Sequence, residues 1–325
     1  MRKKFLFGVV LGCALLAAGC GSKPVNSPEP ELREETGNLT EKAEEEVPEE
    51  TPVPEETPVP EETSVPEKVT EAPETVTVVS KEARVEANGR EVFIKGYMPD
   101  DNEKHPAVIL SHGYNGSHAD FTKECKYYAE NGYVAYALDF CGGSGRSKSS
   151  GKSTETTIFT EKEDLLAVYN YVSGLENVDS EKIYLFGGSQ GGLVTALAAE
   201  ELSDKIEGMA LYFPAFNIPD DWRNTYKTEE EIPETTDFWG LRLGKCFFTS
   251  IRDFYTFDNI GTFSEKVLII HGDKDTIAPL SVGKKAAELY SNAELVILPG
   301  EGHGFTPAGA VTAMEKVLEF MQGEE

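Results

Sequence analysis

From residue 76 onward, short apolar runs alternate with longer amphipathic stretches. The runs are four to six residues long, which is typical of strands covered on both faces, and they are Ala107–Leu110, Tyr133–Leu138, Ile183–Phe186, Gly208–Phe213, Val267–Ile270 and Leu295–Leu298. The stretches between them have helical character, and they are Asp120–Asn131, Glu161–Val172, Gln190–Glu201, Gly283–Ser291 and Pro307–Met321. This alternation of strands and helices along the sequence predicts an α/β fold, in which a mostly parallel central sheet carries helices on both faces.

A hairpin is predicted ahead of this alternation. The β-rich runs Val76–Val85 and Glu91–Met98 flank the dipeptide Asn88-Gly89. That dipeptide is favoured in tight turns because both of its residues tolerate a positive φ. The sheet is therefore expected to start with two antiparallel strands.

Residues 215–265 interrupt the alternation with many aromatic side chains, which include both tryptophans of the chain. A structureless loop of this length is uncommon, so the segment is predicted to be an inserted cap with a small core of its own. Most of these rings are expected to pack within the cap. Trp222 and Trp239 are the candidates for contact with a substrate.

The first twenty residues have the pattern of a targeting signal. A basic start, Arg2–Lys4, precedes the apolar run Phe5–Gly19, which is shorter than the roughly 20 residues of a spanning helix. The ending Ala17–Cys20 resembles the cleavage box of bacterial lipoprotein signals, which implies a lipid on Cys20. The alternative is an ordinary cleaved signal in which the cysteine is a coincidence. Either way, the chain is expected to act outside the cytoplasm, and the resemblance implies a membrane anchor.

Residues 21–75 contain ten of the eighteen prolines and seventeen glutamates, partly in a repeated Thr-Pro-Val-Pro-Glu-Glu hexad. So few apolar residues cannot form a core, so this segment is predicted to be a disordered, extended stalk. Residues 76–325 are long enough for one substantial domain.

The charge balance excludes one class of partner. The net charge is −27, and with +3 on residues 1–20 and −13 on residues 21–75, the remaining chain carries −17. Because phosphate binding needs a cationic surface, no nucleic-acid partner is expected.

Three cysteines, Cys125, Cys141 and Cys246, remain after the predicted signal and lipidation site. They form no C-x-x-C motif and no Cys/His ligand spacing, so neither a zinc site nor a redox motif is expected. Buried free thiols are the default expectation, and one disulfide with a leftover thiol is the alternative.

The clearest chemical motif is Gly-Gly-Ser-Gln-Gly at residues 187–191. It lies between a predicted strand and a predicted helix, which is the setting in which G-x-S-x-G presents a nucleophilic serine on a sharp turn. Ser189 is therefore the candidate nucleophile. The backbone N–H of Gln190, at the start of the helix, is a candidate donor to an oxyanion.

A serine hydroxyl needs a base, and the chain has five histidines. His303 lies in a glycine-rich loop directly after the last predicted strand, where the base falls in the chain order Ser, Asp or Glu, His. His105, in a loop before Pro106, and His118, in the polar stretch Asn115–His118, have no structural reason to reach Ser189. His112 and His271 are expected to have structural roles. His303 is the candidate base.

The acid should lie between Ser189 and His303 in the sequence, at a strand end. Asp273 and Asp275 both follow the strand Val267–Ile270. Asp275 lies further beyond the strand and is preferred, whereas Asp273 is expected to cap the turn. A second oxyanion donor is expected from the backbone N–H of Tyr114, in the loop after Ala107–Leu110.

Four motifs occur in this order along the chain: His112-Gly-Tyr114, the Ser189 turn, His271-Gly-Asp-Lys-Asp275 and Gly302-His303-Gly. With them, the chain resembles the α/β-hydrolase superfamily over roughly residues 83–322. Within the superfamily the chain looks like bacterial cinnamoyl and feruloyl esterases and serine aminopeptidase-like hydrolases. The resemblance implies an α/β-hydrolase fold and hydrolysis of small-molecule carboxylic esters without metal or cofactor.

The expected function is therefore that of a lipid-anchored serine esterase on the cell surface. A peptidase, an amidase or an acylglycerol lipase on the same fold is the first alternative. A surface-binding lipoprotein with an inactive hydrolase fold is the second. The sequence gives no indication of the oligomeric state.

Overall fold

The computed structural model describes residues 76–323 of the chain. The predicted signal segment with Cys20 and the predicted stalk lie outside the described residues, so both stay predictions.

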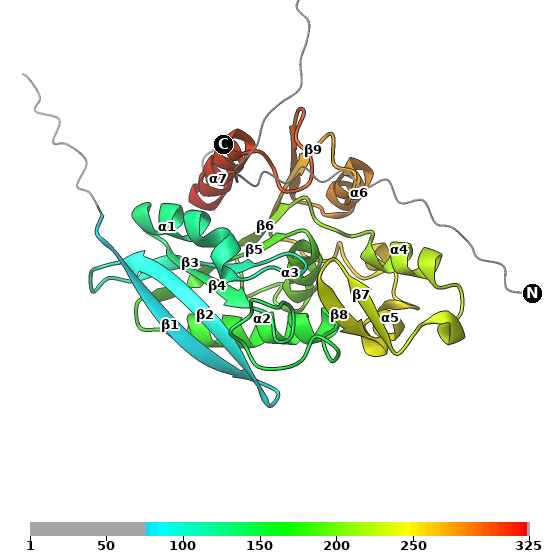
Figure 1. The fold of residues 1–325 in the computed structure, drawn as a ribbon. Helices are drawn as coiled ribbons and strands as arrows, with labels where there is room; N and C mark the ends of the chain where they lie inside the picture. The colour runs from blue at the N-terminus through cyan, green and yellow to red at the C-terminus, as the bar shows by residue number, and fades with distance from the viewer. Residues whose placement is uncertain (1–75, 324–325) are drawn as a thin grey trace, which may run out of the picture. The chain divides into compact units, whose positions relative to one another are not determined.

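An eight-stranded sheet forms the centre of the described chain (Figure 1). Its strands are β1 (Val78–Ala87), β2 (Arg90–Pro99), β3 (His105–Ser111), β4 (Val134–Asp139), β5 (Val178–Gly188), β6 (Gly208–Tyr212), β9 (Lys266–Gly272) and β10 (Ala293–Leu298). Their spatial order is β1-β2-β4-β3-β5-β6-β9-β10. The pairs β1–β2 and β2–β4 are antiparallel, and every other neighbouring pair is parallel. The predicted mostly parallel sheet is confirmed.

The two antiparallel strands form the expected hairpin. Asn88 and Gly89 have φ values of 50° and 80°, the left-handed region that a two-residue turn of this kind requires. Ala87 pairs with Arg90 across the turn, and the register continues to Val78 opposite Pro99.

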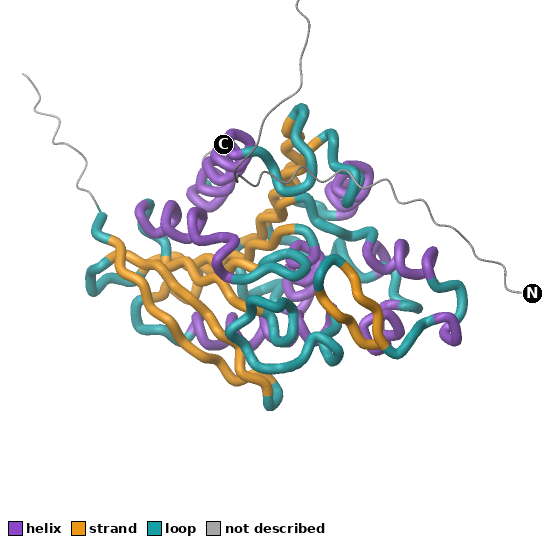
Figure 2. The backbone as a smooth tube through the Cα atoms, in the orientation of Figure 1, coloured by secondary structure: helices purple, strands orange, loops and turns teal. Residues whose placement is uncertain are grey.

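Helices cover both faces of the sheet (Figure 2). They are α1 (Thr122–Glu130), α2 (Ile158–Ser173), α3 (Gln190–Glu201), α6 (Leu280–Leu289) and α7 (Pro307–Gln322), with the short 3₁₀ helix η1 (His118–Phe121) ahead of α1. Alternate residues of each buried strand contribute to two hydrophobic clusters. Val108 and Leu110 of β3 pack with α1 and α7, whereas Ile109 packs with α2 and α3.

The predicted burial of the last strand on both faces is wrong. β10 is the edge strand of the sheet, and Ile297 is 39% exposed. Among residues 76–323, no strand lies beyond it to extend the sheet, so this apolar run is only partly covered.

The segment between β6 and β9 holds the elements predicted as a cap. They are α4 (Ile218–Thr225), η2 (Glu229–Glu231), β7 (Thr235–Phe238), β8 (Leu241–Gly244), α5 (Lys245–Ile251) and η3 (Thr256–Asp258), and β7 pairs with β8 in a separate antiparallel hairpin. Phe247 and Phe248 of α5 belong to the same hydrophobic cluster as α2 and α3. The prediction of a separate cap core is therefore wrong, because α5 packs directly on the main domain.

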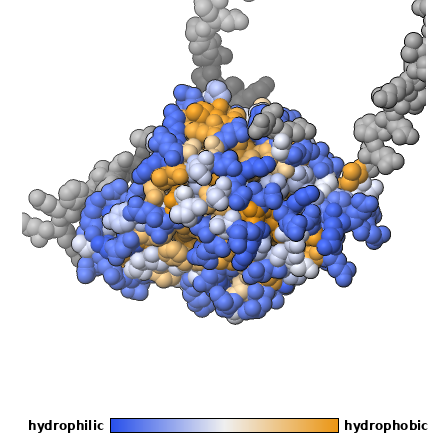
Figure 3. All heavy atoms as spheres, turned by 180° about the vertical axis from the view of Figure 1, so that it is seen from behind, coloured by the Kyte–Doolittle hydropathy of each residue, from blue (hydrophilic) through white to orange (hydrophobic). Residues whose placement is uncertain are grey.

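Cys125 and Cys141 are buried free thiols, as expected, but Cys246 is exposed. Among residues 76–323, no helix combines the length and apolarity needed to cross a bilayer. Seen from behind, the surface is mostly hydrophilic, with scattered hydrophobic areas (Figure 3).

Candidate active site

Ser189 occupies the turn between β5 and α3. Its backbone has φ 54° and ψ −120°, which a non-glycine residue rarely adopts. Close packing holds the turn. A Cβ on Gly187 would lie 2.3 Å from the carbonyl oxygen of Gly191, and a Cβ on Gly191 would lie 2.3 Å from that of Ser111. Glycine is thus required at both positions, and the half-buried Ser189 side chain lies at the end of the sheet, where it lines the cleft.

The structure brings Ser189, His303 and Asp275 together in one hydrogen-bonded chain. His303 Nε2 lies 2.8 Å from Ser189 Oγ, although 114 residues separate the two in sequence. His303 Nδ1 lies 2.8 Å from Asp275 Oδ2. With the proton on Nδ1, the imidazole donates to the carboxylate and can accept the serine proton at Nε2.

Asp275 is fixed by backbone groups of its own turn. Its Oδ1 accepts hydrogen bonds of 2.9 Å from the N–H groups of Ile277 and Ala278, which leaves Oδ2 for His303. Asp273 instead accepts a 2.7 Å hydrogen bond from the N–H of Gly300. The preference for Asp275 over Asp273 therefore agrees with the geometry.

His271 lies behind this carboxylate. It is fully buried, and its Nε2 lies 2.7 Å from the carbonyl oxygen of Ala278 and 3.4 Å from Asp275 Oδ2. Burial disfavours the charged imidazole and lowers the pKa of His271. A neutral His271 with its proton on Nε2 supports the turn that carries Asp275.

The other three histidines, His105, His112 and His118, make contacts away from the Ser189 hydroxyl. They bind Asp101, the N–H of Phe140 and Asp139, respectively. His105 was expected in a loop, but it is the first residue of β3 because its N–H pairs with the carbonyl of Asn177.

Two backbone donors are available beside Ser189. Within residues 76–323, the N–H groups of Tyr114 and Gln190 are not used in any hydrogen bond, and Gln190 is the first residue of α3. A Cβ on Gly113 would lie 3.1 Å from Ser189 Cβ, so the loop after β3 touches the serine. The two predicted oxyanion donors thus flank the hydroxyl on neighbouring elements.

A cleft with about 630 Å³ of empty space opens at Ser189. Trp222 and Trp239, the two predicted contact residues, both line it. Sequence reasoning missed the other cap and loop residues of the wall, which have no motif; they are Ala215, Asn217, Ile218, Asp221, Thr225, Phe238, Phe247 and Ile277. The wall is mainly apolar and aromatic, and Asp221 provides a carboxylate.

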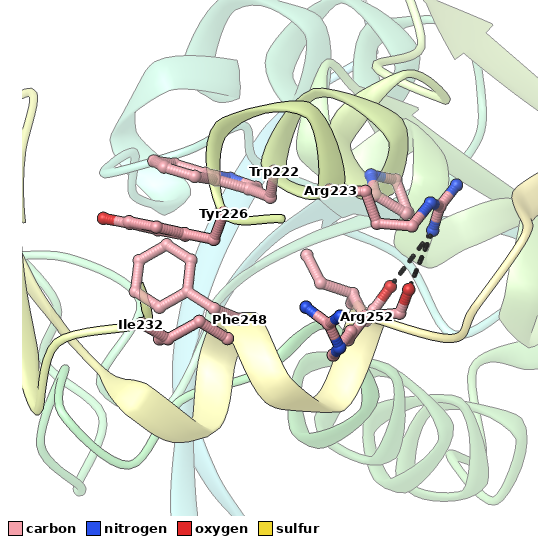
Figure 4. Close-up of a pocket in the computed structure, with 8 residues that line it drawn as sticks. Trp222, Arg223, Tyr226, Ile232, Phe248 and Arg252 are labelled. Carbon is pink, nitrogen blue, oxygen red and sulfur yellow. Dashed lines mark hydrogen bonds between the residues drawn. The ribbon is translucent and has the colours of Figure 1, made fainter. Parts of the chain in front are cut away.

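A smaller pocket lies within the cap, behind Trp222 (Figure 4). Trp222 stacks on Tyr226 with ring centroids 5.9 Å apart, and the Phe248 ring meets Trp222 edge-on at 4.6 Å. Arg223 donates to the carbonyl groups of Ile251, Arg252 and Phe254. These contacts join α4 to α5 and hold Trp222 at the cleft wall.

Among the described side chains, no group of three or more His, Cys, Asp and Glu is arranged to hold a metal ion.

Residues 119–324 match the model of the prolyl oligopeptidase family. Among relatives of known sequence, an uncharacterized peptidase of Bacillus subtilis, YtmA, is 25% identical over 60% of this chain and 74% of its own length. Caffeoylshikimate esterase of Arabidopsis thaliana is 32% identical over 42% of this chain, but the chain spans only 41% of that protein.

Among solved structures, Est1E from Butyrivibrio proteoclasticus with bound ferulic acid is similar to this chain. The TM-score is 0.66 at 29% identity, and the alignment covers 74% of this chain and 98% of Est1E.

Proposed function

This chain belongs to the prolyl oligopeptidase family and is a hydrolase with the α/β-hydrolase fold, and on that premise we propose that it is a serine hydrolase that cleaves carboxylic esters. One observation carries the proposal. The Ser189 hydroxyl, the His303 imidazole and the Asp275 carboxylate form a hydrogen-bonded chain with both distances at 2.8 Å, at the floor of an aromatic cleft.

The reaction follows from this geometry. His303 takes the proton of Ser189 as Oγ attacks the ester carbonyl, and the N–H groups of Tyr114 and Gln190 stabilise the oxyanion. The imidazolium, held by Asp275, then gives its proton to the leaving alcohol, and an acyl-serine forms. Water, activated by the same imidazole, releases the acid and restores the hydroxyl.

The cleft favours an aromatic acyl group. Its wall contains Trp222, Phe238 and Trp239, and flat rings bind well against such side chains. Ferulic acid is the ligand in the Est1E structure, and an esterase of caffeoylshikimate is among the relatives. A hydroxycinnamoyl-type ester is therefore the proposed substrate.

Cleavage of an aminoacyl amide is the second candidate. The family is named for a peptidase, YtmA is described as a peptidase, and Asp221 in the cleft could bind a substrate amine. Asp221→Asn separates the two candidates, because it should impair aminoacyl turnover and leave uncharged aryl esters unaffected.

The direct test is a substrate panel with the full chain. Alkyl ferulates, aminoacyl arylamides and acylglycerols are compared by kcat/KM, and a fluorophosphonate probe measures reactive serine. The proposal expects labelling at Ser189 and the highest kcat/KM on the ferulates. A chain that is neither labelled nor active on any substrate would instead be the inactive surface lipoprotein.

The location outside the cytoplasm is proposed from the sequence of residues 1–20 alone. A lipid on Cys20 would place the chain in the membrane fraction, and Cys20→Ala should release it. Mass spectrometry of the mature N-terminal peptide checks this. An unacylated N-terminus at another residue would contradict lipid anchoring but not the catalytic proposal.

A further inference from the structure

Glu161 is a buried carboxyl group that contacts the residue next to the nucleophile. It lies in the first turn of α2 and is 1% exposed, and Gln190, which directly follows Ser189, is 4% exposed. The two side chains come from different helices and are joined inside the protein. The reaction proposed for Ser189 assigns no role to this carboxyl.

Both carboxyl oxygens of Glu161 hold the same atom. They lie 2.9 and 2.8 Å from Nε2 of Gln190, and within residues 76–323 they have no other side-chain partner. The start of α2 is itself fixed by a capping box between Thr157 and Thr160, and the N–H of Glu161 donates to the carbonyl of Thr157. The carboxyl is therefore presented from a rigid helix end.

Gln190 connects this carboxyl to the reaction centre. Its side chain is held by Glu161, its backbone N–H is unused, and the residue lines the cleft beside Ser189. A side chain fixed at its far end restricts rotation of the peptide unit to which it is attached. Restricting this unit matters because an oxyanion donor acts only when it is already aimed at the developing charge.

We propose that Glu161 is a positioning residue that fixes the Gln190 side chain and thereby aims the Gln190 N–H at the carbonyl oxygen of the bound ester. The inference rests on the proposed serine hydrolysis, since an oxyanion donor has no role without it. An apolar residue would fill the same space without the desolvation of a carboxyl group, so packing alone does not account for a glutamate here.

The protonation state of Glu161 should make kcat depend on pH. Burial raises the pKa of Glu161 to about 8, and the neighbouring carboxylate of Asp164 on α2 acts in the same direction. The hydrogen bond from Gln190 acts in the opposite direction and lowers this pKa. Asp164 itself pairs with Arg90 of β2, and the charge of an ionised Glu161 raises the pKa of Tyr114. Below about pH 8 the carboxyl is mostly neutral, so it accepts from Gln190 Nε2 through its unprotonated oxygen and adds no negative charge near the oxyanion.

Above that pH an ionised Glu161 opposes the negative charge of the tetrahedral intermediate. The wild-type kcat on a neutral ester should therefore decline on the alkaline side with a midpoint near pH 8. Glu161→Gln has a neutral amide at every pH and can still bind the Gln190 amide. It should keep most of the activity at pH 7 and lose this alkaline decline.

Glu161→Leu removes the partner of Gln190 altogether. It should lower kcat by up to about 10²-fold, the scale of a displaced catalytic donor, while KM changes by less than about threefold. Asp164→Asn is the matched control, because Asp164 is buried on the same helix, binds Arg90 and the N–H of Cys141, and makes no hydrogen bond to Gln190. Loss of the Asp164 charge lowers the pKa of Glu161, so kcat of this variant should equal that of the wild type at pH 6, and its alkaline decline should begin at a lower pH.

The experiment measures kcat and KM on a neutral aryl ester from pH 6 to 10, with active sites counted by fluorophosphonate and folding checked by circular dichroism. Two results would overturn the role of Glu161. One is a folded Glu161→Leu variant whose kcat equals that of the wild type, and the other is a Glu161→Gln variant whose kcat declines at alkaline pH as that of the wild type does. If the leucine variant does not fold, the glutamine profile decides alone. An inactive, unlabelled wild type would instead overturn the proposed function, and the inference with it.

Discussion

The hydroxyl of Tyr114 donates a hydrogen bond of 2.8 Å to the backbone carbonyl of Phe238. The loop after β3 is thereby tied to the β7–β8 hairpin of the cap. A second hydrogen bond of 3.1 Å runs from Nδ2 of Asn115 to the carbonyl of Trp239. Burial raises the pKa of Tyr114, so its phenol remains protonated and keeps donating. One residue thus supplies a backbone donor at Ser189 and a side-chain tether to the cleft wall.

Tyr114→Phe should loosen this tether without removing the backbone donor. A lost hydrogen bond of this kind is worth about 0.5–1.5 kcal/mol, so KM for an aryl ester should rise about 2- to 10-fold, with kcat nearly unchanged. Steady-state kinetics measure both constants. Tyr255→Phe, at an exposed ring outside the cleft, is the control. A Tyr114→Phe enzyme with wild-type KM would show that the tether does not shape the cleft.

Asp275 and Asp273 provide a matched pair two residues apart. Asp275→Asn removes the charge that stabilises the imidazolium, and kcat should fall by about 10⁴-fold. Asp273→Asn alters a hydrogen bond to the N–H of Gly300 and an ion pair with Lys274, neither of which involves His303, and it should retain activity within a few-fold. Equal losses in the two variants would argue against Asp275 as the orienting acid.

The turn that carries Ser189 and the order of Ser189, Asp275 and His303 could be predicted because each lies in a short local motif at a strand end. The glycines of the turn belong to the same motif, although Gly191 is also required by a close approach of Ser111 in β3. The pairing of Glu161 with Gln190 and of Tyr114 with Phe238 could not be predicted. Each joins elements far apart in the sequence through side chains that fit many other settings.

Contacts between elements far apart in the sequence also explain why two predictions about the fold are wrong. The apolar run Leu295–Leu298 has the pattern of a buried strand. Its burial depends on whether another strand lies beyond it, and the part of the chain that the structure describes has none there. The aromatic residues of the cap indicate burial, but their sequence does not show whether they pack within the cap or on the central sheet domain. Phe248 packs in the hydrophobic cluster that includes α2 and α3.

The two tryptophans of the cleft should respond differently to truncation. Trp239 is 60% exposed, so Trp239→Ala should raise KM for aromatic esters and leave the melting temperature close to that of the wild type. Trp222 packs against Tyr226 and Phe248, so Trp222→Ala should also lower stability, by about 3 kcal/mol. Kinetics and thermal unfolding of both variants measure the difference, and equal melting temperatures would count against this assignment.

Glu161 should also make the free energy of unfolding depend on pH. Its pKa is raised from an ordinary value of 4.5 to about 8 in the folded chain, so the folded state holds the proton more tightly than the unfolded state. The stability from this carboxyl is fully present below about pH 4.5 and is lost as the pH rises to about 8. Glutamine at this position does not titrate.

The free energy of unfolding of Glu161→Gln, relative to the wild type, should therefore increase across that pH window. Urea unfolding at pH 5, 6.5 and 8 measures it. A constant difference at the three pH values would mean that Glu161 is ionised in the folded chain throughout.

The most direct measurement is the turnover of an alkyl ferulate by Ser189→Ala, with His303 and Asp275 unchanged. We predict that kcat falls by about 10⁶-fold and that fluorophosphonate labelling is lost. A folded Ser189→Ala chain that hydrolyses the ester at the wild-type rate would show that the reaction takes place elsewhere.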